Sequence, residues 1–151
     1  MGKFDGPYFE VENEDVVSIW AATGALADIP EDYFQENLGG DDHEPFNQFS
    51  ADFGFGFYDH DFVETYCTED WRIVPISELI DPLSYSSSFL NATVRRAEDL
   101  GVGRTCYVFL MYNFKYDPTA AGIQESAYMR FVGVFPYDRH ANGGPLLPAN
   151  S

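Results

Sequence analysis

The apolar residues of this chain fall into four strand-like runs. Residues 16–20, 62–68, 104–114 and 127–135 are rich in β-branched and aromatic side chains. The last two runs, RTCYVFLMYNF and AYMRFVGVF, are separated by the turn-rich segment KYDPTAAGIQES. The pattern predicts an antiparallel sheet with strands near Val16, Phe62, Tyr107 and Met129. A further short strand is expected over residues 71–76, interrupted at Pro75.

Other segments have apolar residues three and four positions apart, which predicts helices. The main predicted helix covers residues 86–100 and ends at Gly101, a residue typical of a C-terminal cap. Its apolar stripe consists of Phe89, Leu90, Thr93, Val94, Ala97 and Leu100. A shorter N-terminal helix is expected over residues 29–38, with Asp28 as its N-cap and apolar Ile29, Tyr33, Phe34 and Leu38.

Together these elements predict an α+β fold, in which helix 86–100 covers one face of the antiparallel sheet and helix 29–38 flanks it. A chain of 151 residues suits a single domain spanning 1–151. Within it, the polar lead-in 1–14 and the Gly-, Pro- and Asn-rich tail 140–151 are expected to be loosely ordered.

Between residues 41 and 61 acids alternate with aromatic residues. The spacing of Phe46, Phe49 and Phe53 suits a helical turn, whereas Phe53, Phe55 and Phe57 alternate as in a strand. Gly54 and Gly56 decide between these two interpretations, because they break any helix there.

The formal net charge of −17 changes this picture because it is concentrated in the first half of the chain. No Lys or Arg occurs between Lys3 and Arg72, a stretch that holds eighteen of the 25 Asp and Glu residues. Such an excess repels phosphate backbones and anionic lipids, which argues against nucleic-acid and membrane partners. It favours a cationic partner: a metal ion, a basic small molecule or a basic protein surface. The alternative is charge that only keeps the protein soluble.

A metal site is one alternative for the acidic residues. Asp59, His60, Asp61 and Glu64 are four potential ligands within six positions. In a strand, however, Asp59 and Asp61 share a face while His60 points away. The spacings typical of metal sites are also missing, so no metal and no cofactor are expected, and a protein-binding role is preferred.

Catalytic constellations are not recognisable. Ser84 and Ser86–Ser88 precede a predicted helix, where serine is favoured for capping, and no nucleophile lies beside a histidine. Cys67 and Cys106 fall in predicted strands, where packing is their ordinary role, although their pairing stays open. The chain is therefore not expected to be an enzyme. A small enzyme and an acidic ligand-binding domain remain the alternatives.

The N-terminal sequence MGKFDGPYFEVENED has no apolar stretch that follows a basic start, as a signal peptide or membrane anchor would. The protein is therefore expected in the cytoplasm.

Several short motifs, in order, resemble the bacterial immunity protein 22 family. They are Val17-Ser18-Ile19-Trp20, Asp52-Phe53-Gly54 followed by Tyr58-Asp59, Asp61-Phe62 and Glu64, then Ser84-Tyr85-Ser86 with Ser88-Phe89, and Tyr112-Asn113-Phe114. The resemblance implies an antidote encoded beside a polymorphic toxin, which it neutralises by binding. Residues 21–44 and those beyond Asp117 depart from the family pattern, and such variable surfaces can carry partner specificity.

The expected function is thus neutralisation of a cognate, basic toxin, with a nuclease as one possibility, by stoichiometric binding through an acidic surface. The expected interface consists of Glu31, Asp32, Glu36, Asp41, Asp42, Glu44, Asp59, Asp61 and Glu64, with Phe46 and Tyr58 as aromatic anchors.

Overall fold

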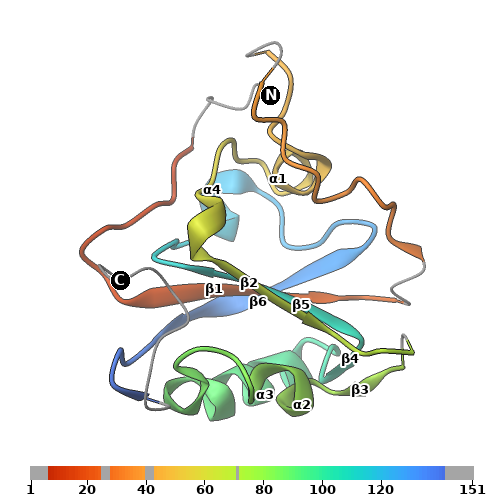
Figure 1. The fold of residues 1–151 in the computed structure, drawn as a ribbon, viewed down its shortest axis with the longest axis vertical. Helices are drawn as coiled ribbons and strands as arrows, with labels where there is room; N and C mark the ends of the chain where they lie inside the picture. Colours follow the sequence, from red (N-terminus) through yellow and green to blue (C-terminus); the bar gives the residue numbers. More distant parts are fainter. Residues whose placement is uncertain (1–6, 25–27, 40–42, 71, 142–151) are drawn as a thin grey trace.

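In the computed structural model, a four-stranded sheet lies between a layer of helices and a layer built mostly of loops (Figure 1). The structure describes residues 7–24, 28–39, 43–70 and 72–141. Helices α2 and α3 cover one face of the sheet, and α1 and α4 lie on the other side with the loops. The α+β fold predicted from the sequence is confirmed.

The sheet is antiparallel and has the order β2-β5-β1-β6. Its strands are β1 (Val16–Ala22), β2 (Val63–Cys67), β5 (Tyr107–Tyr112) and β6 (Met129–Pro136). All four lie where the apolar runs predict them. Ile19 in the central strand β1 pairs with Leu110 of β5 on one side and with Gly133 of β6 on the other.

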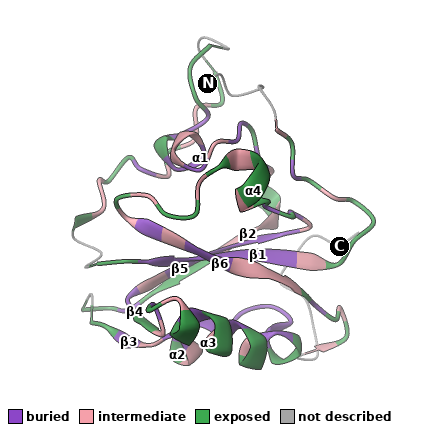
Figure 2. Cartoon of the chain, turned by 180° about the vertical axis from the view of Figure 1, so that it is seen from behind, coloured by how far each residue is buried: buried purple, intermediate pink, exposed green. Residues whose placement is uncertain are grey.

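Strand β1 is buried on both faces, as Figure 2 shows for the centre of the sheet. Val17, Ile19 and Ala21 belong to the apolar core on the helical side, whereas Trp20 and Ala22 belong to the core on the opposite side. This double burial explains why the strand reads as a continuous apolar run rather than an alternating one.

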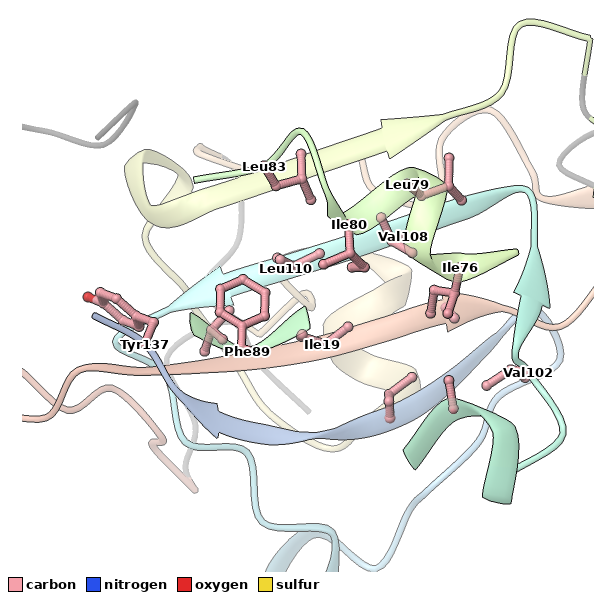
Figure 3. Close-up of a cluster of buried hydrophobic side chains, with 14 of the residues drawn as sticks. Ile19, Ile76, Leu79, Ile80, Leu83, Phe89, Val102, Val108, Leu110 and Tyr137 are labelled. Atoms are coloured by element: carbon pink, nitrogen blue, oxygen red, sulfur yellow. The ribbon is translucent and has the colours of Figure 1, made fainter. Parts of the chain in front are cut away.

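The helical layer contains α2 (Ile76–Ile80) and α3 (Leu90–Asp99). Ile76 and Ile80 of α2, with Phe89 just before α3, pack against Val108 and Leu110 of β5 (Figure 3). Helix α3 covers this face of the sheet, as its apolar stripe predicts. None of the described helices, of which α3 with ten residues is the longest, is long and apolar enough to cross a membrane.

We call residues 28–39 and 43–62, on the other face of the sheet, the loop layer. Together with the sheet and α4 (Pro118–Ala121), they bury an aromatic cluster around Trp20. The ring centroid of Trp20 lies 5.1 Å from that of Phe49 and 5.2 Å from that of Phe131. The aromatic members of the cluster are Phe9, Trp20, Tyr33, Phe46, Phe49, Phe53, Phe55, Tyr58, Phe109, Phe114, Tyr116 and Phe131.

The predicted helix over residues 29–38 is wrong. The segment makes single turns, in which the Tyr33 N–H donates to the Pro30 carbonyl and the Gln35 N–H to the Asp32 carbonyl, each at 3.0 Å. Two backbone groups of this segment form hydrogen bonds with residues 46–49 instead of with each other, as they would in a helix. The Asn37 N–H donates to the Phe46 carbonyl at 2.7 Å, and the Tyr33 carbonyl accepts from the Phe49 N–H at 3.2 Å.

The first α-helix of the chain is instead α1 (Gln48–Asp52). Asn47 caps it, because its Oδ1 accepts the Ser50 N–H at 2.8 Å and its own N–H donates to Ser50 Oγ at 3.3 Å. The helical turn that suits the spacing of Phe46, Phe49 and Phe53 is therefore present, whereas residues 53–57, whose alternation suggested a strand, do not form one. The helical turn ends before Gly54, whose φ of 76° leaves the helical region.

The main helix is shorter than the predicted 86–100. Tyr85 adopts a left-handed conformation with φ of 62°, which prevents a regular α-helix from beginning there. Residues Ser86–Ser88 form a 3-10 helix, and Ser86 Oγ donates to the Asp81 carbonyl at 2.6 Å. The α-helix begins only at Leu90.

The strand expected over residues 71–76 is reduced to β3 (Val74–Pro75), which pairs with β4 (Arg104–Thr105) in a separate two-stranded sheet. Trp71 lies outside the described residues. Pro75 has no N–H to extend the pairing, and α2 follows at once.

Part of the expected loose lead-in is paired with the end of β5. The Val11 N–H donates to the Asn113 carbonyl at 2.9 Å, and the Phe9 carbonyl accepts from the Lys115 N–H at 2.8 Å. Phe9 is buried in the aromatic cluster. Residues 1–6 of the lead-in and 142–151 of the tail lie outside the described residues.

We predict that Phe49→Ala lowers the free energy of unfolding by about 3–5 kcal/mol, the usual effect of emptying a large core position. Phe49 is fully buried between Trp20 and Phe109, with ring centroids 5.1 Å and 4.6 Å away. Urea denaturation measures the change, with exposed Gln48→Ala on the same helix as the control. A loss below about 1 kcal/mol contradicts the central position of this ring.

Candidate functional site

The loop layer brings several of the predicted interface residues together. Its segments are tied to one another: Asn37 donates to Phe46, Asn47 Nδ2 donates to the Tyr58 hydroxyl at 2.7 Å, and His60 Nδ1 lies 2.8 Å from Glu36 Oε2. The acids that share this layer are Glu31, Asp32, Glu36, Glu44, Asp59 and Asp61. They therefore stand on the side of the sheet opposite α2 and α3.

These acids differ in how they are held. Glu31, Asp32, Glu44 and Asp61 are exposed, and Glu44 Oε2 accepts a hydrogen bond from Asn37 Nδ2 at 3.2 Å. Asp59 caps the 3-10 helix His60–Phe62, because its Oδ1 accepts the Asp61 N–H at 2.9 Å. Asp41 and Asp42, also expected in the interface, lie outside the described residues.

Phe46 and Tyr58, expected to be exposed anchors, are core residues. Each is 1% exposed, and their rings pack edge to face with centroids 4.9 Å apart. Burial raises the pKa of Tyr58 strongly. Neither ring can reach a partner unless the aromatic cluster opens, so neither can anchor an interface with this structure.

The large apolar side chains that are exposed in this layer are Leu38, at 77%, and Phe57, at 37%. Sequence reasoning missed them in this role, because the spacing of Leu38 suits the buried face of a helix and that of Phe57 suits a strand. The two glycines after Leu38 fit the end of that helix, so no local signal indicates that Leu38 is exposed.

Glu64, the last predicted interface residue, is bound to the helical side of the protein. Its Oε1 accepts the Ser84 N–H at 3.0 Å and the Tyr112 hydroxyl at 2.8 Å, while its Oε2 accepts the Ser84 hydroxyl at 3.1 Å. Burial, followed by the Glu64 charge, raises the pKa of Tyr112 strongly, so this tyrosine stays a hydrogen-bond donor. Glu64 thus links β2, β5 and the loop before the 3-10 helix Ser86–Ser88.

The four residues weighed as metal ligands do not converge. His60 points to Glu36, Asp59 binds its own backbone turn, and Glu64 binds Ser84. In the described part of the chain, no three His, Cys, Asp or Glu side chains are grouped to hold a metal ion. Cys67 is exposed and Cys106 buried, and neither forms a disulfide.

A pocket of about 480 Å³ lies between the paired lead-in and the ends of β2 and β5. The carboxylates of Glu10, Glu12 and Asp59 line it, and Phe62 and Tyr112 add apolar surface. Partial burial, then Asp59 and Glu12, raises the pKa of Glu10. Sequence reasoning missed Glu10 and Glu12 because they lie in the expected loose lead-in, where acids at positions 10, 12 and 14 were the available signal.

The segments that carry the family resemblance belong mostly to the scaffold. Trp20, Phe53 and Phe114 are core residues of the aromatic cluster. Glu64, Ser84 and Tyr112 form the hydrogen-bonded link described above. These motifs therefore specify how the layers are joined, and the exposed acids stand largely outside them.

One family model matches the chain. The model described as Immunity protein 22 covers residues 17–138, which is most of the sequence. No curated protein and no solved structure matches the chain.

We predict that Glu64→Ala lowers the free energy of unfolding by about 2–3 kcal/mol, because the Ser84 and Tyr112 donors lose a charged acceptor. Glu69→Ala, at an exposed carboxylate beyond β2, is the matched control and should change stability by less than about 0.5 kcal/mol. Chemical denaturation compares the two variants. Equal stabilities would show that the Glu64 link does not hold the layers together.

We also predict that Glu10→Gln raises the melting temperature at pH 7. A carboxyl whose pKa is raised on folding binds its proton more tightly in the folded state, so stability falls as pH rises from 4.5, its ordinary pKa, through the folded value. Glu10→Gln has no ionisable carboxyl at this position, so it does not lose this stability as the pH rises. At about pH 3.5, where Glu10 is protonated in both states, the gain should disappear. Thermal unfolding at both pH values provides the measurement, and a gain that is independent of pH contradicts the electrostatic origin.

Proposed function

The chain belongs to the immunity protein 22 family, and on that premise we propose that its toxin-neutralising role is carried out by the acidic loop layer, which binds a basic surface of the toxin. The observation that carries this proposal is that the segments with Glu31, Asp32, Glu36, Glu44, Asp59 and Asp61 lie on the side of the sheet away from α2 and α3. Binding is stoichiometric and requires no cofactor or turnover.

The uneven charge of the two layers supports this assignment. Residues 72–104, which include α2 and α3, contain four acids and four arginines and are formally neutral. The loop layer, residues 28–39 and 43–62, contains eight acids and no Lys or Arg. Charge that served only solubility would not need such segregation.

A basic active site is the natural target for an acidic inhibitor. Enzymes that cleave nucleic acids bind phosphate through Lys and Arg, so carboxylates on a rigid surface can occupy the same region as a charge mimic. We therefore propose a nuclease as the toxin, bound in the cytoplasm. Nucleic acid and membranes, both anionic, are not partners in this mechanism.

Two competing explanations predict different behaviour. A metal- or ligand-binding domain, or a small enzyme, would keep a bound ion or ligand through purification, which elemental analysis and mass spectrometry detect. A purely solubilising charge would let the acids be neutralised without effect on toxin binding. The proposed function requires that neutralising these acids weakens toxin binding.

The test neutralises three exposed acids of the loop layer in the triple variant Glu31→Gln, Asp32→Asn and Asp61→Asn. With the catalytically inactivated toxin domain encoded beside the gene as the probe, the association rate at low salt should fall on the order of tenfold. The salt dependence of that rate should also decrease. Stopped-flow or surface plasmon resonance measures both.

The matched control removes the same charge from the helical layer, in the triple variant Glu78→Gln, Glu98→Gln and Asp99→Asn, all at exposed positions. Its association rate should stay within about twofold of the unmodified protein, a modest change that reflects the lower net charge. Equal effects of the two triple variants would show that net charge alone, and not the loop layer, attracts the toxin.

A further inference from the structure

Two large apolar side chains stand exposed among the acids of the loop layer. Leu38 is 77% exposed and Phe57 is 37% exposed. Single exposed apolar residues are ordinary, but two of them on joined segments form a surface that water solvates poorly.

Phe46 joins the segments that carry Leu38 and Phe57. The ring of Phe57 packs edge to face on the buried ring of Phe46, with centroids 5.0 Å apart. The Phe46 carbonyl accepts the Asn37 N–H at 2.7 Å, and Leu38 is the next residue after Asn37. Both exposed side chains are thus carried by backbone that the aromatic core holds in place.

Acidic groups border these two residues on the same segments. Glu36, two positions before Leu38, pairs with His60, which is three positions after Phe57. Glu44 is bound to Asn37, and Asp61 follows His60. The segments that carry this surface therefore combine apolar side chains with carboxylates, and they contribute no Lys or Arg, because the sequence has none between Lys3 and Arg72.

We propose that Leu38 and Phe57 are the apolar anchors of the toxin interface, with Glu36, Glu44 and Asp61 as its charged rim. The complementary partner surface is an apolar depression flanked by Lys or Arg side chains. This inference rests on the proposed function, and it replaces Phe46 and Tyr58 as anchors with side chains that a partner can reach.

The anchors and the rim act on different rate constants. Rim carboxylates accelerate association through long-range attraction, whereas buried apolar anchors slow dissociation. Because the Phe57 ring is already held by Phe46, little side-chain entropy is lost on binding, which favours a tight complex.

Two other exposed apolar side chains provide a matched control. Tyr66 on the edge strand β2 and Ile73 before β3 are each 43% exposed. Ile73 lies in a basic neighbourhood, because Arg72 precedes it and Arg104 Nη2 donates to its carbonyl at 3.2 Å. Neither side chain belongs to the loop layer, so this second apolar pair should not contribute to binding.

The test compares the double variants Leu38→Ala with Phe57→Ala and Tyr66→Ala with Ile73→Ala, using the inactivated toxin domain encoded beside the gene as the probe. We expect the first pair to increase the dissociation rate at least about tenfold, with little change in association rate. The second pair should dissociate as the unmodified protein does. Surface plasmon resonance resolves both rate constants, and circular dichroism verifies folding.

Leu38→Gln keeps the test independent of folding, because this side chain is mostly outside the core. It alone should increase the dissociation rate about threefold or more. If the unmodified protein binds the toxin domain but both Leu38 variants dissociate at its rate, the anchor inference is overturned and the proposed function stands. If the unmodified protein does not bind, both are overturned.

Discussion

Both faces of the central strand β1 have to be kept from water, and the rest of the structure follows from that requirement. Val17 and Ile19 are covered by α2 and α3, but Trp20 points to the opposite face, where the described helices α1 and α4 have five and four residues. Aromatic side chains from the loops close that face around Trp20. Because large rings bury much apolar surface per residue, a layer with little regular structure can still complete the core. The acidic loops are thereby held in a fixed arrangement.

The sequence predicted those elements whose signal is local. The four sheet strands and the covering helix were found because β-branched runs and an apolar stripe report directly on burial. Residues 29–38 were misassigned because the spacing of Ile29, Tyr33 and Leu38 also suits a chain of turns, and the choice depends on hydrogen bonds to Phe46 and Phe49. Nor could the sequence show that Phe46 and Tyr58 face the sheet. Glu64 finds partners 20 and 48 positions away, which no local pattern reveals.

The family match and the proposed specificity depend on different parts of the molecule. Trp20, Phe53, Glu64, Ser84 and Tyr112, which carry the resemblance, fill the cores or join the layers. Exposed residues such as Glu31, Asp32 and Leu38 lie outside these motifs. A scaffold of this kind allows the surface to change while the fold is retained, which is how related inhibitors come to discriminate between related partners.

The contrast between a neutral helical layer and a strongly acidic first half has a consequence for the moments before contact. In the proposed mode of binding, this contrast gives the protein a dipole directed across its sheet. In the field of a cationic partner it experiences a torque, which turns the negative end forward while the two molecules are still separated by about a Debye length, near 8 Å at physiological ionic strength. Encounters then begin from a restricted set of orientations. In the proposed complex, α2 and α3 lie on the far side from the toxin and remain exposed to solvent.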